Sequence, residues 1–143
     1  MNIELKDLLE SGIAKRYRID NFPTFSAVES LKELVTTILE PLSEAIEKSI
    51  IVSRGFMCER VNALSGCMDQ VHVKGYAADV FPLDGNLQGF IEDAESWLRD
   101  NDVAFDESKE EIDKEGHHFW HIAIYGDNGE QRRKFNEDET TTE

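Results

Sequence analysis

Gly75-Tyr-Ala-Ala-Asp-Val-Phe81 and Phe119-Trp-His-Ile-Ala-Ile-Tyr125 decide the fold, because both are apolar runs of the kind that form buried strands. Pro82 closes the first run, and the second is followed by Asp127-Asn-Gly129, which has the composition of a hairpin turn. The turn predicts a return strand over residues 131–135. We therefore expect antiparallel pairing at the end of the chain.

Further strands and several helices complete the expected architecture. Ser49–Arg54 is a short β-branched run that indicates a buried strand, and Val103–Asp106 is a candidate edge strand. Pro41 either kinks a long helix or ends it and opens a second one that reaches about Lys48. Capping residues and helical spacing predict one or two short helices over 3–18, the long helix behind a Ser26/Glu29 capping box, a helix over 57–65 ended by Gly66, and one capped by Asn86. The expected fold class is α+β, a small antiparallel sheet with flanking helices.

Length and charge limit the organisation and the partners. The chain has 143 residues, the length of one domain, and we expect residues 1–135 to form it and the acidic residues 136–143 to form a solvated tail. Thirty Asp and Glu against fifteen Lys and Arg give a formal net charge of −15. Phosphate groups and anionic lipids both require a basic face, so we expect neither nucleic-acid nor membrane binding. The oligomeric state is not indicated.

The first residues and the cysteines bear on the compartment. Met1-Asn-Ile-Glu-Leu-Lys-Asp7 has neither a basic region nor a long apolar segment, so we expect cytoplasmic synthesis without a signal peptide. Two cysteines, Cys58 and Cys67, are too few for a disulfide scaffold, and we expect them to be reduced.

Two histidines and an aspartate lie beside the strands in a pattern that suits a metal. Six residues separate His72 from Asp79, and among them Gly75 lets the chain turn while two alanines leave space. His121 lies in the late strand. Two imidazoles and one carboxylate form an open three-ligand set, which on zinc leaves a fourth tetrahedral position for water. The spacing also arises by chance, and a histidine in an aromatic strand is commonly a packing residue, so spacing alone leaves both interpretations open.

A wider pattern carries a family resemblance. Ser53-Arg-Gly-Phe-Met-Cys-Glu-Arg-Val-Asn62, His72-Val-Lys-Gly-Tyr-Ala-Ala-Asp-Val80 and Phe119-Trp-His-Ile-Ala123 together resemble the zinc D-Ala-D-Ala carboxypeptidases and related peptidoglycan endopeptidases. The most similar members are the small single-domain ones found in phages. The resemblance extends forward to Asn21-Phe-Pro23 and covers nearly the whole chain, to about residue 135.

The resemblance implies zinc ligands, a fold and a reaction. In that family a His-six residues-Asp motif and a later Trp-His strand supply the three zinc ligands, and His72, Asp79 and His121 stand at those positions. The implied fold sets helices against a small antiparallel sheet, as in the hedgehog signalling domain, with zinc in a groove on the sheet. The implied reaction is hydrolysis of an amide bond next to a D-amino acid in a peptidoglycan peptide. A carboxylate serves as general base, and an arginine steadies the substrate carboxylate or the developing oxyanion.

The chain departs from the family pattern at the arginine. Small members have Gly-Tyr/Phe-Arg-Ser/Cys where this chain has Gly55-Phe-Met-Cys58, so Met57 stands at the arginine position. A thioether cannot replace a guanidinium fork. Arg54 and Arg60 are the candidate substrate-binding replacements, although neither is in register.

The catalytic carboxylate is the second open assignment. Relatives place it a few residues before the third ligand, where this chain offers Glu111, Glu115 and, as a non-carboxylate, His118. In a regular strand position 115 shares a face with His121, which favours Glu115 as the catalytic residue, with His118 second.

These observations predict a zinc metallopeptidase that hydrolyses peptide bonds next to D-amino acids in peptidoglycan, as a carboxypeptidase or an endopeptidase, and that reaches the cell wall on lysis. Met57 supports an alternative, a catalytically impaired zinc-binding relative that acts as a cell-wall peptide recognition or structural module. A third interpretation is a host-interaction domain that uses the fold without metal.

Overall fold

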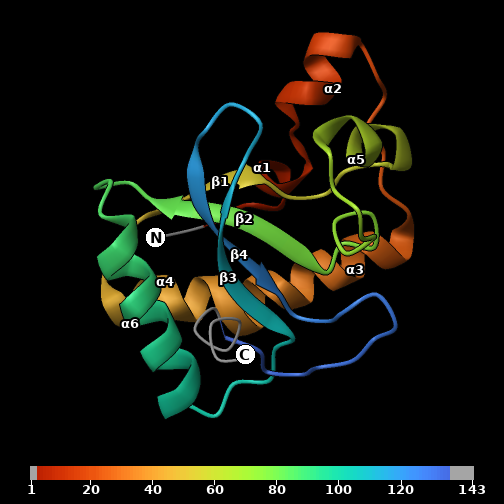
Figure 1. Ribbon diagram of the computed structural model, residues 1–143. Coiled ribbons are helices and arrows are strands. Elements are labelled where there is room, and N and C mark those ends of the chain that lie inside the picture. The colour runs from red at the N-terminus through yellow and green to blue at the C-terminus, as the bar shows by residue number, and fades with distance from the viewer. Residues whose placement is uncertain (1–2, 136–143) are drawn as a thin grey trace, which may run out of the picture.

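The computed structural model describes residues 3–135, and its fold class is α+β, as expected: a four-stranded antiparallel sheet with flanking helices (Figure 1). The predicted tail, residues 136–143, lies outside the described residues. In chain order the elements are α1 (Leu5–Leu9), α2 (Gly12–Tyr17), α3 (Phe25–Leu34), the π-helical η1 (Val35–Leu39), α4 (Glu40–Ile46), β1 (Ile50–Arg54), α5 (Glu59–Ser65), β2 (Ala77–Pro82), α6 (Leu87–Asp100), β3 (Glu107–Ile112) and β4 (His118–Ala123).

The two apolar stretches form the centre of the sheet. The strand order is β1-β2-β4-β3, and every neighbouring pair is antiparallel. Side chains alternate between the two faces of a strand. Val80 and Trp120 therefore lie on one face, where they join the main core, and Asp79 and His121 lie on the other.

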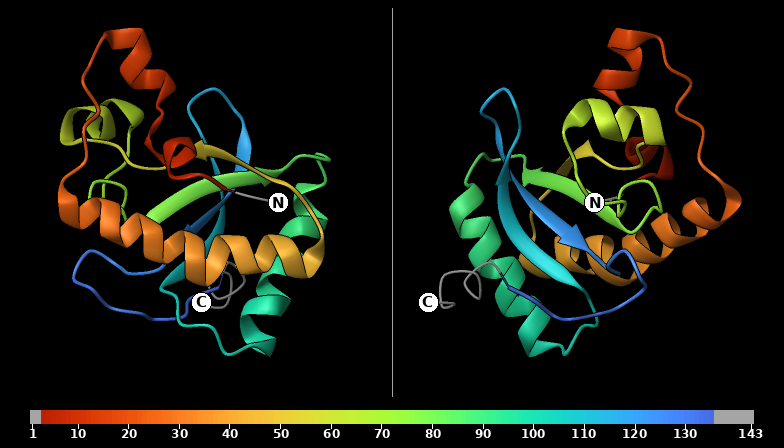
Figure 2. Two further views of the ribbon diagram at one scale, coloured as in Figure 1. Left: turned by 180° about the vertical axis from the view of Figure 1, so that it is seen from behind. Right: turned by 45° about the vertical axis from the view of Figure 1, so that its right-hand side comes forward.

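Helices cover the face of the sheet that carries Trp120. The long helix α3–η1–α4 and helix α6 lie on this side, while α2 and α5 lie on the other (Figure 2). The main core is built mostly from these two helical segments and the sheet, with Leu8 of α1 and two loop phenylalanines, and includes Leu31, Leu34, Ile38, Leu42, Phe90, Ala94, Leu98, Val80, Trp120 and Ile122. The opposite face of the sheet carries the buried polar residues Asp79 and His121 beside a small apolar cluster that includes Ala77 and Ala123. None of the helices within residues 3–135 combines the length and the apolar character needed to cross a membrane.

The predictions for the second half of the sheet were wrong in two places. The edge strand is Glu107–Ile112 rather than Val103–Asp106, and β4 forms its hairpin with this preceding strand. Residues 131–135 form no return strand and contribute only an isolated parallel bridge from Lys134 to Glu107. The charged sequence of β3 lacks the apolar signal of a strand, and pairing with the buried β4 stabilises it instead.

The long helix resolves the two interpretations of Pro41 and corrects its predicted cap. The helix continues through Pro41 to Ile46, and the turn before the proline widens into η1. A proline lacks the N–H for the helical hydrogen bond and crowds the carbonyl one turn earlier, which a wider turn relieves. The Ser26/Glu29 capping box was wrong, because the N-cap is Thr24, whose hydroxyl accepts a 3.1 Å hydrogen bond from the Ala27 amide.

Candidate metal centre

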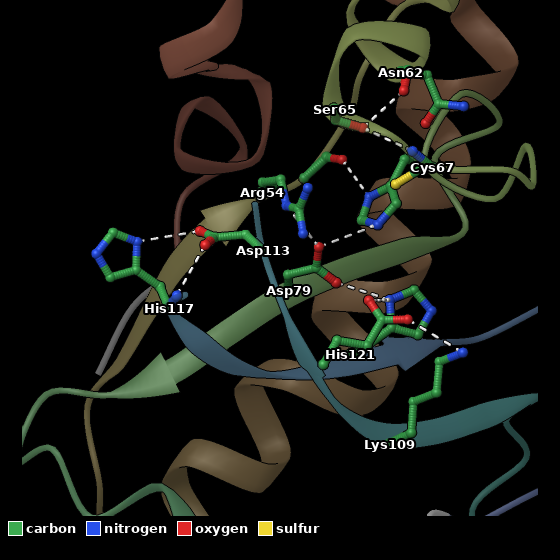
Figure 3. Close-up of polar contacts among 12 residues, drawn as sticks. Arg54, Asn62, Ser65, Cys67, Asp79, Lys109, Asp113, His117 and His121 are labelled. Atoms are coloured by element: carbon green, nitrogen blue, oxygen red, sulfur yellow. Dashed lines mark hydrogen bonds and ion pairs between the residues drawn. The ribbon is translucent and has the colours of Figure 1, made fainter. Parts of the chain in front are cut away.

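Antiparallel register brings four polar side chains into one row across the sheet. Asp79 on β2 pairs directly with His121 on β4. Arg54 on β1 is the partner of Asp79, and Lys109 on β3 is the partner of His121. Each residue of the row therefore comes from a different strand, and Figure 3 shows Arg54, Asp79, His121 and Lys109 following one another.

His72 joins this row from the loop before β2. Gly75 turns that loop with φ +75°, and a Cβ on it would lie 2.3 Å from the Ala27 carbonyl oxygen, so glycine is required both for the conformation and for the close approach to α3. Nδ1 of His72 donates a hydrogen bond to the Gly55 carbonyl at 2.8 Å. This bond leaves Nε2, 3.3 Å from Oδ2 of Asp79, as the nitrogen that can bind a metal.

The three predicted ligands meet in a buried cluster. Ligand atoms of His72, Asp79 and His121 all lie within 4.8 Å of one another, and the residues are 1%, 0% and 3% exposed. Nδ1 of His121 donates to Oδ1 of Asp79 at 2.7 Å. The sequence prediction that these three residues converge is therefore confirmed, whereas their binding of zinc stays a prediction.

One carboxylate oxygen in the cluster lacks a hydrogen bond. Oδ2 of Asp79 is buried between Nε of Arg54, at 3.0 Å, and Nε2 of His72, at 3.3 Å, and it has hydrogen-bond geometry to neither. A buried polar atom without such a bond is costly and needs an explanation. A cation bound by the three residues would satisfy this oxygen, and two imidazoles with one carboxylate are a donor set that zinc accepts. The residues present thus fit zinc.

Ionisation in the cluster follows from mutual attraction. Burial alone would raise the pKa of the Asp79 carboxyl, but attraction to His72 and the hydrogen bond from His121 outweigh it and hold the pKa far below its usual range. Burial likewise lowers the pKa of His121, yet its hydrogen bond and attraction to Asp79, with smaller contributions from Glu111 and Glu107, raise it overall. Asp79 is therefore ionised at neutral pH, as a metal ligand must be.

The cluster borders a cavity of about 490 Å³, a size within the range of small-molecule sites. Its lining includes His72, His121, Arg54, Cys67, Lys109 and Glu111. Cys58 and Cys67 are both free thiols, and burial raises the pKa of Cys67.

Arg54 enters this cavity and Arg60 does not. Among the described residues, Arg54 has Asp79 as its ion-pair partner and stacks over the Phe119 ring at 4.7 Å from the guanidinium carbon, and its terminal nitrogens make no hydrogen bond. Arg60 is exposed on α5 and does not line the cavity. Met57, which stands where the family that the sequence resembles has an arginine, is 1% exposed and packs in a small apolar cluster with Val61. Of the two arginines singled out from the sequence, only Arg54 reaches the site.

The two residues favoured for catalysis lie away from the cluster. Glu115 is in the exposed β3–β4 loop, where it contacts Arg16 and His117. His118 binds Glu110 at 2.8 Å. Since it lies three positions before His121 on a regular strand, it projects from the opposite face.

Glu111 is the carboxylate that the structure brings to the cluster. Its Oε1 lies 3.8 Å from Nδ1 of His121, and its Oε2 lies 3.1 Å from Nζ of Lys109. Both Glu111 and Glu115 are candidates from the sequence. The prediction favours Glu115 because it assumes that the strand of His121, with its alternating side chains, extends back to residue 115, and the structure has the β3–β4 loop there. Sequence reasoning missed Lys109 altogether, and only the correct bounds of β3 reveal it.

A second group of possible ligands lies in the β3–β4 loop. Asp113, Glu115 and His117 also offer ligand atoms within 4.8 Å of one another, but Glu115 and His117 are exposed. Figure 3 shows Asp113 and His117 well apart from His121.

Comparisons with known proteins add nothing to this geometry: no protein-family model matches the chain, and no curated protein matches it.

Proposed function

We propose that the protein is a zinc-dependent hydrolase of peptide bonds next to D-amino acids in peptidoglycan, with His72, Asp79 and His121 as the zinc ligands. The observation that carries the proposal is the convergence of these three residues around a buried carboxylate oxygen that has no hydrogen bond. The bound ion would supply a Lewis acid that polarises the carbonyl of the scissile bond. The peptidoglycan substrate is supported by the sequence resemblance alone.

Glu111 is the general base in this proposal. It is the carboxylate that contacts the cluster while lying partly open to the cavity, with a side chain 31% exposed. In that place it can accept a proton from an attacking water and pass it to the leaving amine. Lys109 contacts both Glu111 and Glu107, and so acts as a positioning residue that holds the Glu111 carboxylate at the cavity wall.

Arg54 is the substrate-binding arginine in this proposal. In the family that the sequence resembles, that arginine stands at the position of Met57. The terminal nitrogens of Arg54 have no hydrogen-bond partner among the described residues, and its side chain lines the cavity beside the cluster. A guanidinium with open donors in a partly buried site binds a carboxylate or a developing oxyanion. Met57, sealed in its apolar cluster, contributes none of these donors.

The second candidate function is a zinc-binding module that recognises a cell-wall peptide without cleaving it. The observation that favours it is the contact between Arg54 and Asp79, because a guanidinium held by the metal ligand is less available to a substrate. The two functions share the ion and differ only in chemistry, so one experiment separates them.

That experiment incubates the zinc-loaded protein with purified peptidoglycan and measures released amino groups and free D-Ala. We expect release that disappears in Glu111→Gln while the zinc content stays unchanged. Zinc binding at one equivalent without any release would favour the recognition module. Failure of the purified wild-type protein to bind zinc would contradict both functions.

A further inference from the structure

A second hollow adjoins the cavity that holds the ligand cluster. Its volume is about 300 Å³, and its walls come from α2, the end of β1 and the β3–β4 loop. Arg54, Ser65, Asp113 and Lys114 line both hollows. The two hollows are therefore adjacent, with Arg54 between them, and we treat them together as one groove.

The groove has exposed apolar side chains along both hollows. Met68 and Ile112 border the hollow with the cluster, and Tyr17 and Leu64 border the second one. Exposed apolar residues that line a concave surface are typical of a binding groove. A ligand that extends along the whole groove contacts both pairs.

Charge in the second hollow is balanced although the chain has a formal net charge of −15. The charged residues that line it are three cations and three anions: Arg16, Arg54, Lys114, Glu10, Asp113 and Glu115. Arg16 and Glu115 contact each other at 3.4 Å between α2 and the β3–β4 loop. A balanced lining suits a peptide that carries both amino and carboxyl groups, and it suits neither a polyanion nor a strongly cationic chain.

The cations near the cluster indicate how such a peptide lies. A carboxypeptidase needs a free cation for the terminal carboxylate and a wall that closes the site behind it. Lys109 is paired with Glu107 and Glu111, and Lys114 donates to the Leu64 carbonyl at 3.0 Å. Among the described residues that line this cavity, Arg54 is the remaining cation, and its terminal N–H groups make no hydrogen bond. The groove continues beyond Arg54 into the second hollow.

We infer that the substrate chain continues past Arg54 into the second hollow, so that the hydrolysed bond is internal: the protein is an endopeptidase and not a carboxypeptidase. This inference rests on the proposed hydrolase function. Arg54 then meets a carbonyl or a carboxylate carried within the peptide, rather than a terminal carboxylate. Water adds to the scissile carbonyl, the C–N bond breaks, and the proton from water passes to the leaving amine, so the hydrolysis needs no other co-reactant.

The first test compares two peptidoglycan fragments with the zinc-loaded protein. One is the monomeric stem peptide that ends in D-Ala-D-Ala, and the other is the cross-linked dimer, in which the D-Ala carbonyl forms an internal amide. We expect kcat/KM for the dimer to exceed that for the monomer by at least about tenfold, the scale of a lost subsite. Release of terminal D-Ala from the monomer at an equal or higher rate would overturn the inference and leave the hydrolase intact. Cleavage of neither fragment would overturn both.

A variant pair at Gly12 tests the second hollow directly. Gly12 lines this hollow, and a Cβ on it would meet no atom within 4 Å. Gly12→Phe fills the space and Gly12→Ala adds only a methyl group. We expect Gly12→Phe to raise KM for the dimer by about tenfold or more with little change in kcat, because binding alone is lost. Zinc content and Tm serve as controls for the fold, and an unchanged KM in a folded Gly12→Phe protein would contradict the inference.

Discussion

The cluster of His72, Asp79 and His121 offers two imidazoles and one carboxylate, the group in the β3–β4 loop offers one imidazole and two carboxylates, and in both the ligand atoms lie within 4.8 Å of one another, but the two groups are held differently. The first is buried and draws on two paired strands and a loop turned by Gly75. The second belongs to a single turn between β3 and β4, and most of it is exposed. The first therefore depends on the whole fold and the second only on local chain geometry.

The two groups also differ in how their carboxylates are satisfied. Oδ1 of Asp113 accepts hydrogen bonds from the amides of Glu115 and His117, each at 2.9 Å. These bonds explain the position of Asp113 without any ligand, as in other turns closed by an aspartate. Asp79, in contrast, keeps one buried oxygen without a hydrogen bond. Proximity of possible ligand atoms is thus a weak sign of a metal site, and a buried ligand oxygen without a hydrogen bond is a stronger one.

The largest expected difference between the two groups is in zinc content after one histidine of each is replaced. His72→Ala removes a ligand of the buried cluster. Loss of a residue that only supports a ligand weakens metal binding by roughly 10–100-fold, and we expect loss of the ligand itself to weaken zinc binding by more than that. His117→Ala removes an imidazole of the same chemistry from the loop and is expected to leave zinc affinity unchanged. Zinc per protein after gel filtration, with chelator competition for the affinity, measures both.

Equal zinc content in the two alanine variants would contradict the assignment of the buried cluster as the metal centre. His72→Ala also removes the hydrogen bond to the Gly55 carbonyl. Its circular dichroism and Tm are therefore measured without metal, to separate loss of the ligand from loss of the fold.

The next effect concerns catalysis and compares the two glutamates. Glu111→Gln keeps the shape of a side chain that contacts His121, and we expect kcat on peptidoglycan peptides to fall by about 10²–10⁴-fold, the usual contribution of a general base. Glu115→Gln alters an exposed loop residue that lines the second hollow and lies away from the cluster, so we expect kcat to change less than about threefold and any larger effect to appear in KM. A larger loss in Glu115→Gln than in Glu111→Gln would reverse the assignment.

This pair of glutamates shows how far the sequence could lead. The ligand triple was predictable because each ligand lies in or next to a strongly apolar strand, and the family resemblance gave the pairing of distant segments. The general base was not, because β3 reads as a charged segment with no strand pattern and its bounds are set by pairing with β4. Once β3 is placed at Glu107–Ile112, Lys109 and Glu111 fall on the side of His121.

The same limit applies to the hairpin and to the arginine. Asp127-Asn-Gly129 does turn the chain, since the Gly129 amide bonds to the Gly126 carbonyl at 2.9 Å, but the residues after it do not pair with β4. The edge of β4 is already occupied by β3, and a local turn signal carries no information about such competition. Arg54 was likewise out of register with the family motif, and only the row across the sheet shows that it reaches the site.

A smaller effect is expected in the pH dependence of the metal-free protein. The pKa of His121 is raised, so its contribution to stability is complete below the unfolded-state value of about 6.5 and is lost as the pH rises through the folded-state pKa. The pKa of Asp79 is lowered, so its contribution is present above about 3.9 and is lost only as the pH falls through the folded-state pKa. Both contributions are present between these values. We expect Tm to be higher near pH 5–6 than at pH 8, by about 2–4 °C for each kcal/mol lost.

Net charge also changes over this range, so a matched control is needed. His121→Gln is expected to lose this part of the pH dependence, while His117→Gln, which removes one exposed histidine, keeps it. Parallel curves for the wild type and His121→Gln would show that the buried pair does not contribute to stability.

The smallest expected effect is on stability, and it tests whether Asp113 serves to close the β3–β4 turn rather than to bind a metal. Asp113→Ala removes the acceptor for two backbone amides, and we expect a loss of about 0.5–1.5 kcal/mol in the free energy of unfolding, the scale of a typical hydrogen bond. Asp113→Asn keeps an oxygen that can accept both bonds and is expected to retain most of that stability. Urea unfolding at neutral pH measures both, and zinc content stays the same in each. A loss of zinc in Asp113→Asn, whose amide oxygen preserves the turn but not the charge, would instead make the loop group a metal site and remove the distinction between the two regions.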